Sequence, residues 1–216
     1  MPATARVRRG PGRPRDEQLS HRRRKEILSV AIRHFAEHGF ADTDMQLIAD
    51  DLGVGKGTVY RYFPSKERLF LAAVDRGMEA LREAVDAAAA RATGPLARIE
   101  AGISAYLEYF DRHPATAELI IQERAQFRDR KRPTYFVHRD ANLGPWRELF
   151  AGLIADGVMR DVPVDRIVGV VSDFLYGTMF TNHFAGRKTS LATQARDVLD
   201  VLFHGLLAKR KRGYDE

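Results

Sequence analysis

Two short helical patterns joined by a glycine turn constrain the fold of this chain more than any other feature. Thr43 and Gln46 have the spacing of a capping box, which predicts the start of a helix of about two turns. The segment 52–55 is half glycine and ends that helix, and a second short helix is expected over residues 56–63. Such a pair forms a helix-turn-helix, whose second helix lies in the major groove of DNA.

Helical periodicity continues on both sides of this segment. Apolar residues recur at helical spacing from Ile27 to Phe35, and Gly39 follows at the position of a helix C-terminus. Further helices are expected over residues 65–91, 95–111, 114–127, 133–157, 164–185 and 190–209. No strand pattern competes with them. The sequence therefore predicts an all-α fold, in which an N-terminal three-helix domain with the helix-turn-helix joins a larger helical domain.

The positive charge of the chain is concentrated at its N-terminus. The net charge is +6, and residues 1–25 contain nine Arg and Lys against two acidic residues, so the rest of the chain is almost neutral. A basic arm beside a neutral body suits DNA, although a solvated tail would have the same composition. Residues 9–15 are similar to Gly-Arg-Pro hooks, which place arginines in an A·T-rich minor groove; a flexible linker is the alternative. The arginines of such a hook would be Arg9, Arg13 and Arg15.

Three divisions of the chain are expected. They are a flexible basic arm (1–20), the helix-turn-helix DNA-binding domain (21–66) and a helical effector-binding and dimerisation domain (67–216). The chain has no cysteine, which fits a reducing compartment. Neither a signal peptide nor an apolar run of roughly 18 residues is recognisable, so we expect a cytoplasmic protein without a membrane partner.

The predicted second helix of the motif has a distinct outward face. Val59 and Phe63 are four residues apart and would hold the helix on the core. Lys56 and Arg61 can donate to guanine or phosphate. Thr58 can contact a thymine methyl, and Gly57 lets the backbone approach the bases. The residues that would face outward are Gly57, Thr58, Tyr60 and Arg61.

At these residues the sequence resembles the TetR family of repressors. That family shares a Thr before the first helix of the pair, a G-x-x-K-G-T-hydrophobic-Tyr run, here 53–60, and an F-x-S-K-E run, here 63–67. Over residues 22–70 the resemblance implies phosphate contacts from Thr43, Tyr60, Tyr62 and Lys66. It implies contacts at or near bases from Lys56, Gly57, Thr58 and Arg61. Gly55 departs from the family, which often has Ser there, and so lacks a hydroxyl at the turn.

Two motif matches point to other chemistry, and both fail. Residues 34–38 fit the H-x-x-E-H zinc pattern, but Phe35 belongs to the predicted core and no third ligand is evident. Residues 53–58 are similar to a phosphate-binding loop, but Gly57 stands where Ser or Thr is required and no strand precedes it. We therefore expect no catalytic site, no metal and no cofactor.

The helices of the larger domain suggest a dimer interface and a ligand cavity. The apolar stripes of residues 164–209 are wider than one core needs, so we expect a four-helix bundle with a second copy, with a thick monomer core as the alternative. The expected interface residues are Phe174, Leu199, Leu202 and Leu206. Aromatic and polar residues typical of a ligand cavity, each of which could equally be ordinary packing or surface, are Tyr106, Tyr109, Glu118, Gln122, Phe127, Trp146 and His183.

These features together predict a dimeric, sequence-specific repressor that a small-molecule effector releases from a palindromic operator. The alternative is an architectural DNA-binding protein that needs no effector. The bulk of the apolar C-terminal domain argues against that alternative, because bending DNA through a basic arm does not require it.

Overall fold

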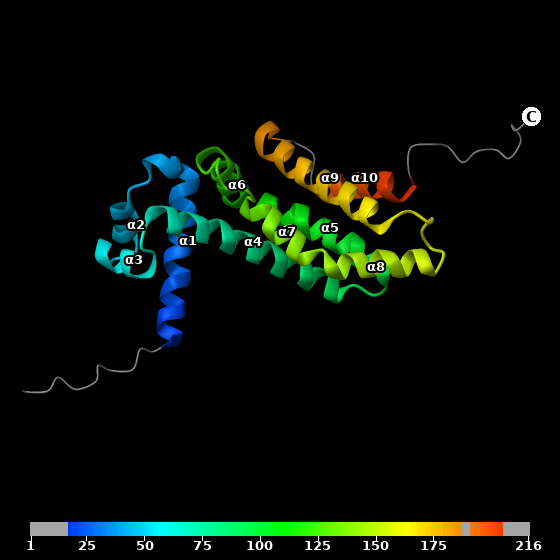
Figure 1. Ribbon diagram of the computed structural model, residues 1–216, viewed down its shortest axis with the longest axis horizontal. Coiled ribbons are helices and arrows are strands. Elements are labelled where there is room, and N and C mark those ends of the chain that lie inside the picture. The colour runs from blue at the N-terminus through cyan, green and yellow to red at the C-terminus, as the bar shows by residue number, and fades with distance from the viewer. Residues whose placement is uncertain (1–16, 187–190, 205–216) are drawn as a thin grey trace, which may run out of the picture.

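The computed structural model describes residues 17–186 and 191–204, and within these ranges every regular element is an α-helix (Figure 1). The prediction of an all-α fold is confirmed. The helices are α1 (Glu17–Asp42), α2 (Met45–Asp51), α3 (Lys56–Tyr62), α4 (Lys66–Arg91), α5 (Pro95–Arg112), α6 (Pro114–Gln126), α7 (Thr134–Asn142), α8 (Gly144–Ala155), α9 (Val164–Ala185) and α10 (Leu191–His204).

Three expectations about helix boundaries are wrong. The helix expected over residues 133–157 is two helices, because Pro145 lacks an N–H for the ladder of α7 and begins α8 instead. The N-cap of α2 is Asp44 and not Thr43, since the Asp44 carboxylate accepts from the N–H of Gln46. The segment 17–20, which was expected to belong to the arm, forms the first turn of α1.

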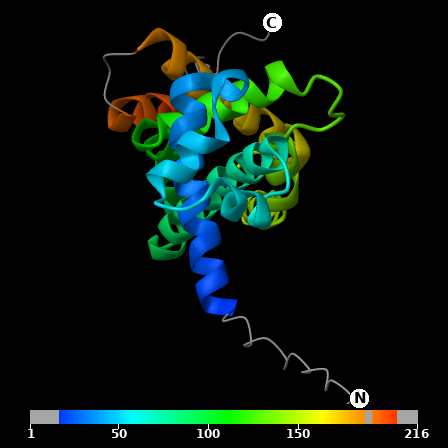
Figure 2. The ribbon, with the colours of Figure 1, turned by 90° about the vertical axis from the view of Figure 1, so that its left-hand side faces the viewer.

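The helices α1, α2 and α3 gather at one end of the molecule and form the head. The N-terminal half of α1 projects away from the other helices (Figures 1 and 2). Gly39 has φ 79° and interrupts α1 just before the turn into α2, a conformation that favours glycine. The head core consists of fully buried side chains from all three helices, including Phe35, Ile48 and Val59.

The helix α4 connects the head to the remaining helices, which form the body. Ser65 caps its N-terminus by accepting from the N–H of Arg68, and the helix packs against α1 in the head and against α5, α6 and α7 in the body. An aromatic cluster lies at this junction, with ring centroids 5.0–6.1 Å apart. Its members are Phe35, Phe40, Phe70 and Phe127. Head and body therefore share one apolar core.

Among the described residues, no helix has both the length and the apolar character needed to cross a bilayer.

Candidate DNA-binding face and ligand cavity

The outward face of α3 is the candidate DNA-binding face. Val59 and Phe63 bury their side chains in the head core, which directs the opposite face of the helix to solvent. On that face Gly57 and Arg61 are exposed, Tyr60 is 39% exposed, and Thr58 is half-buried. A Cβ atom at Gly57 would meet no other atom within 4 Å, so the backbone is open to a close approach from outside.

Lys56 connects the two helices of the motif. Its ammonium lies 3.1 Å from the Asp44 carboxylate, which also accepts from the N–H of Gln46 at 2.8 Å. The Gln46 N–H and then the Lys56 ammonium lower the pKa of Asp44 below its ordinary value. The Lys56 side chain is 41% exposed, so a phosphate or a base edge can reach the ammonium beside this pair.

Lys66 and Thr43 hold the turn between α1 and α2. The Lys66 ammonium donates to the carbonyls of Ala41 at 2.7 Å and Thr43 at 2.9 Å, and it lies 5.0 Å above the ring of Phe40. The Thr43 side chain is buried, and its hydroxyl donates to the Gly39 carbonyl at 2.6 Å. An ammonium has three donors, so Lys66 keeps one N–H for a phosphate while it ties α4 to the head.

The histidine pattern in α1 has a structural role in this geometry. His34 is buried, and its Nε2 lies 2.8 Å from Asp51 of α2, which also pairs with Arg33. His34 lowers the pKa of Asp51 through this hydrogen bond. In the described part of the chain, no group of three His, Cys, Asp or Glu side chains could hold a metal ion.

The body contains a cavity of about 150 Å³ between α4, α5, α7, α8 and α9. Its walls are mainly aliphatic and aromatic, and they include Leu81, Ile103, Trp146, Phe150, Val168 and Leu175. Gly102 keeps α5 close to Trp146, because a Cβ atom there would lie 2.4 Å from the indole ring. The cavity thus has the apolar walls that small-molecule sites favour.

Two tyrosines, Tyr106 and Tyr135, are the buried residues with a polar side-chain atom among those that line the cavity. The Oη atoms of Tyr106 on α5 and Tyr135 on α7 are 2.9 Å apart, and the two residues are 8% and 3% exposed. Burial raises the pKa of Tyr135 to about 12 and raises that of Tyr106 well above its ordinary value. Both phenols are therefore neutral at physiological pH.

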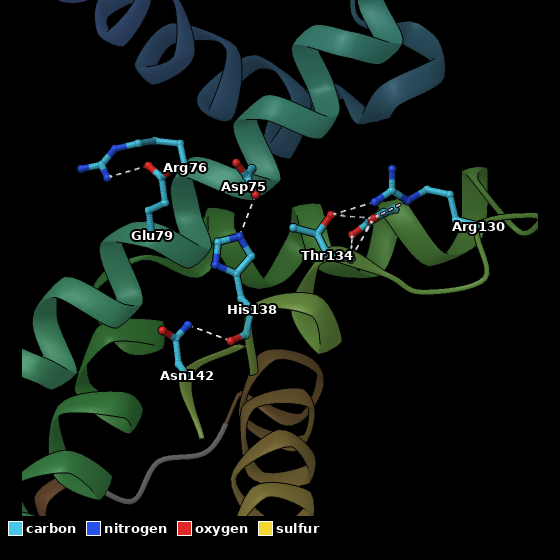
Figure 3. Close-up of polar contacts among 8 residues, drawn as sticks. Asp75, Arg76, Glu79, Arg130, Thr134, His138 and Asn142 are labelled. Atoms are coloured by element: carbon cyan, nitrogen blue, oxygen red, sulfur yellow. Dashed lines mark hydrogen bonds and ion pairs between the residues drawn. The ribbon is translucent and has the colours of Figure 1, made fainter. Parts of the chain in front are cut away.

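The charged groups that line the cavity are already paired with neighbours. Arg82 lies 3.1 Å from Asp86, and Arg139 lies 2.8 Å from Asp140. His138 places its Nε2 2.6 Å from Asp75 of α4, as Figure 3 shows. A histidine of the cavity wall therefore connects α7 to α4.

A buried carboxylate fixes the N-terminus of α7. Glu123 of α6 is 1% exposed and accepts from the N–H of Thr134 at 3.0 Å and from its hydroxyl at 2.8 Å. Arg130 forms an ion pair with the same carboxylate at 3.1 Å, and Figure 3 shows the side chains of Thr134 and Arg130 facing one another. Sequence reasoning missed Glu123, although a signal exists: it lies three residues after the buried Ile120, on the inward face of α6.

Comparison with known proteins accounts for the head. Residues 27–73 match the family model described as bacterial regulatory proteins, tetR family. The head therefore has the DNA-binding domain of the TetR family.

Relatives of this chain are named as regulators of transcription. The transcriptional repressor KstR2 of Mycobacterium tuberculosis is 29% identical over 70% of this chain and 76% of its own length. The transcriptional activator FasR of Mycolicibacterium smegmatis is 32% identical over 53% of this chain, and the match spans half the length of FasR. The solved structure of FadR from Bacillus subtilis, in complex with stearoyl-CoA, is 18% identical in sequence. The match covers 85% of this chain and 99% of the FadR chain, and the TM-score of 0.69 shows the same fold.

The TetR fold brings two of the expected cavity residues together and separates the other five. Tyr106 and Trp146 line the cavity. The others do not line it, because each makes a contact elsewhere: the Tyr109 hydroxyl donates to the Gly77 carbonyl, the Gln122 amide donates to the Phe35 carbonyl, and Phe127 joins the aromatic cluster. Glu118 and His183 pair with each other at 2.9 Å and border a shallow depression near α1.

The expected dimer residues lie on the outer helices of the body. Phe174 is 42% exposed and belongs to an apolar stripe on α9 that also contains Val170 and Phe184. Leu199 and Leu202 are half-buried on α10. Leu206 and the arginines of the arm, Arg9, Arg13 and Arg15, lie outside the described residues.

Proposed function

We propose that this protein is a cytoplasmic, homodimeric repressor of the TetR family whose two heads bind a palindromic operator and release it when a small apolar molecule fills the cavity. The observation that carries the proposal is the position of α4, which begins beside the helix-turn-helix and continues along the wall of the cavity. A change in the cavity can thus alter the spacing of the heads. The repressor KstR2, whose match spans 76% of its length against 50% for the activator FasR, supports repression over activation.

Besides the direct contact of α4 with the cavity, a second route to the head runs through α7. His138 lines the cavity and is hydrogen-bonded to Asp75 of α4, and Glu123 fixes the beginning of α7 on α6. Nine residues before Asp75, Lys66 donates to carbonyls of the head. A ligand that displaces α7 therefore acts on the same helix that positions the DNA-binding face.

The proposed dimer uses the stripe on α9 together with α10. Val170, Phe174 and Phe184 are exposed apolar residues on one face of α9, and a second copy would remove them from water. Two heads related by a two-fold axis require two half-sites about one or more helical turns apart. The stearoyl-CoA bound to the FadR relative has a long apolar chain, which supports an apolar effector here as well.

The test begins with selection of bound sites from random DNA by the purified full chain, followed by light scattering. We expect a palindromic site and a mass of about twice 24.4 kDa. Phe174→Glu should give the monomer mass and lose palindrome binding, because it adds a charge to an exposed part of the stripe without disturbing the core. Val158→Glu, at an exposed apolar residue outside α9, is the matched control and should stay dimeric. A wild-type mass of 24.4 kDa with intact operator binding would refute the dimer.

A further inference from the structure

The hydroxyls of Tyr106 and Tyr135 together carry one hydrogen more than the hydrogen bond between them uses. Each phenol carries one hydrogen, and the contact of 2.9 Å between Tyr106 and Tyr135 uses one of the two. Among the described residues, neither hydroxyl has another hydrogen-bond partner. The second hydrogen is thus a buried donor on one of two cavity-lining tyrosines, without a protein acceptor. Leaving such a donor without a hydrogen bond is costly.

We propose that the effector of this cavity carries a hydrogen-bond-accepting oxygen, such as a carbonyl oxygen, on an apolar body, and that the Tyr106–Tyr135 pair donates its unused hydrogen to that oxygen. This inference rests on the proposed function and names its ligand class. The tyrosines come from α5 and α7, so the ligand oxygen would meet the same helix that contacts α4 through His138.

A neutral acceptor fits this position better than an anion. Burial holds both phenols in the protonated state, so the pair offers a donor and no positive charge. The two arginines that line the cavity, Arg82 and Arg139, already pair with Asp86 and Asp140. A carboxylate beside the tyrosines would lose its hydration without gaining a free counter-charge.

The size of the cavity selects the probes. A cavity of about 150 Å³ accommodates a single aromatic ring. Acetophenone and α-methylstyrene have nearly the same shape. Acetophenone has a carbonyl oxygen where α-methylstyrene has a methylene group. The difference in their affinities therefore reports whether the site recognises an acceptor oxygen.

The experiment is a calorimetric titration of the full-length protein with each probe, without DNA. We expect the wild type to bind acetophenone about fivefold to tenfold more tightly than α-methylstyrene, as one neutral hydrogen bond provides. The double variant Tyr106→Phe/Tyr135→Phe should reduce that ratio to less than about twofold. It should still bind α-methylstyrene, which shows that the cavity is intact. Both tyrosines are replaced because either one alone would keep a donor.

Tyr109→Phe is the matched control, since its hydroxyl donates to the Gly77 carbonyl outside the cavity wall, and it should keep the wild-type ratio. Equal binding of the two probes to the wild type, no binding of either, or a preference that survives in the double variant would each overturn the inference. Release of operator DNA is measured separately. If acetophenone binds with the expected preference but the DNA stays bound, the ligand class stands and the proposed release mechanism fails.

Discussion

The head and the body use polar side chains in opposite ways. The head buries apolar residues from three short helices and leaves Tyr60 and Arg61 on its outer surface. The body instead turns the Tyr106–Tyr135 pair inward and leaves apolar Phe174 outside. A surface that contacts DNA needs polar groups facing out, whereas a cavity for an apolar ligand needs a few of them facing in. Side-chain chemistry therefore indicates function only when the direction of the side chain is known.

The two regions nevertheless share one core, and removing its centre would have the largest effect. Phe70 is fully buried and contacts the rings of Phe35, Phe40 and Phe127. We expect Phe70→Ala to lower the free energy of unfolding by about 3–5 kcal/mol. Denaturant unfolding followed by a signal from each region should show both losing stability together. As a control, Val158→Ala at an exposed site should change the free energy of unfolding little. If the head of Phe70→Ala stayed as stable as that of the wild type, head and body would have two separate cores.

A change at Glu123 should instead be confined to the body. Glu123→Gln keeps the size of the side chain but removes the charge that accepts from Thr134 and pairs with Arg130. We expect a loss of about 1–3 kcal/mol in the free energy of unfolding. Relative to the wild type, the variant should show faster hydrogen exchange in α6 and α7 but not in α2 and α3. Its affinity for DNA without effector should be nearly unchanged. Equal acceleration in the head would contradict the expectation that Glu123 stabilises only the contact between α6 and α7.

The outward face of α3 could be predicted from the sequence because its determinants are local. The spacing of Val59 and Phe63 gives the buried face of α3, and the residues on the opposite face then point outward. The glycines and Pro64 around it mark its ends. The same local reasoning failed at Thr43, because two side chains next to each other compete for the N-cap position and Asp44 occupies it.

The cavity could not be predicted residue by residue, because it depends on how five helices far apart in the sequence pack together. Tyr109 and Tyr106 are both inward residues of α5, yet one contacts α4 and the other contacts Tyr135 of α7. The break before Pro145 was missed as well, and α7 and α8 run in different directions on its two sides (Figure 1). Periodicity predicts which residues are buried, but the partner of each comes from the tertiary arrangement.

Lys66 has two roles, because it stabilises the fold of the head and is also expected to contact a phosphate of DNA. Lys66→Ala removes the donor to the carbonyls of Ala41 and Thr43 and the cation expected to meet a phosphate. We expect weaker binding to all DNA sequences and a slope of log affinity against log salt that is smaller by about one charge. Titrations at several salt concentrations measure this slope. An unchanged slope would leave Lys66 with the structural role only.

Thr58 should give the smallest effect and the most specific one. It lies on the outward face of α3 beside Gly57, where its methyl group is expected to contact a base and not a phosphate. Thr58→Ala should therefore relax the preference at one operator position, at a cost of about 1 kcal/mol there, and leave the affinity for unrelated DNA almost unchanged. Tyr60→Phe is the matched control: it removes a hydroxyl expected at phosphate, so all sequences should weaken to the same small extent. Site selection with both variants separates the two roles. If Thr58→Ala weakened every sequence equally, α3 would be rotated on the DNA so that this face meets the backbone instead of the bases.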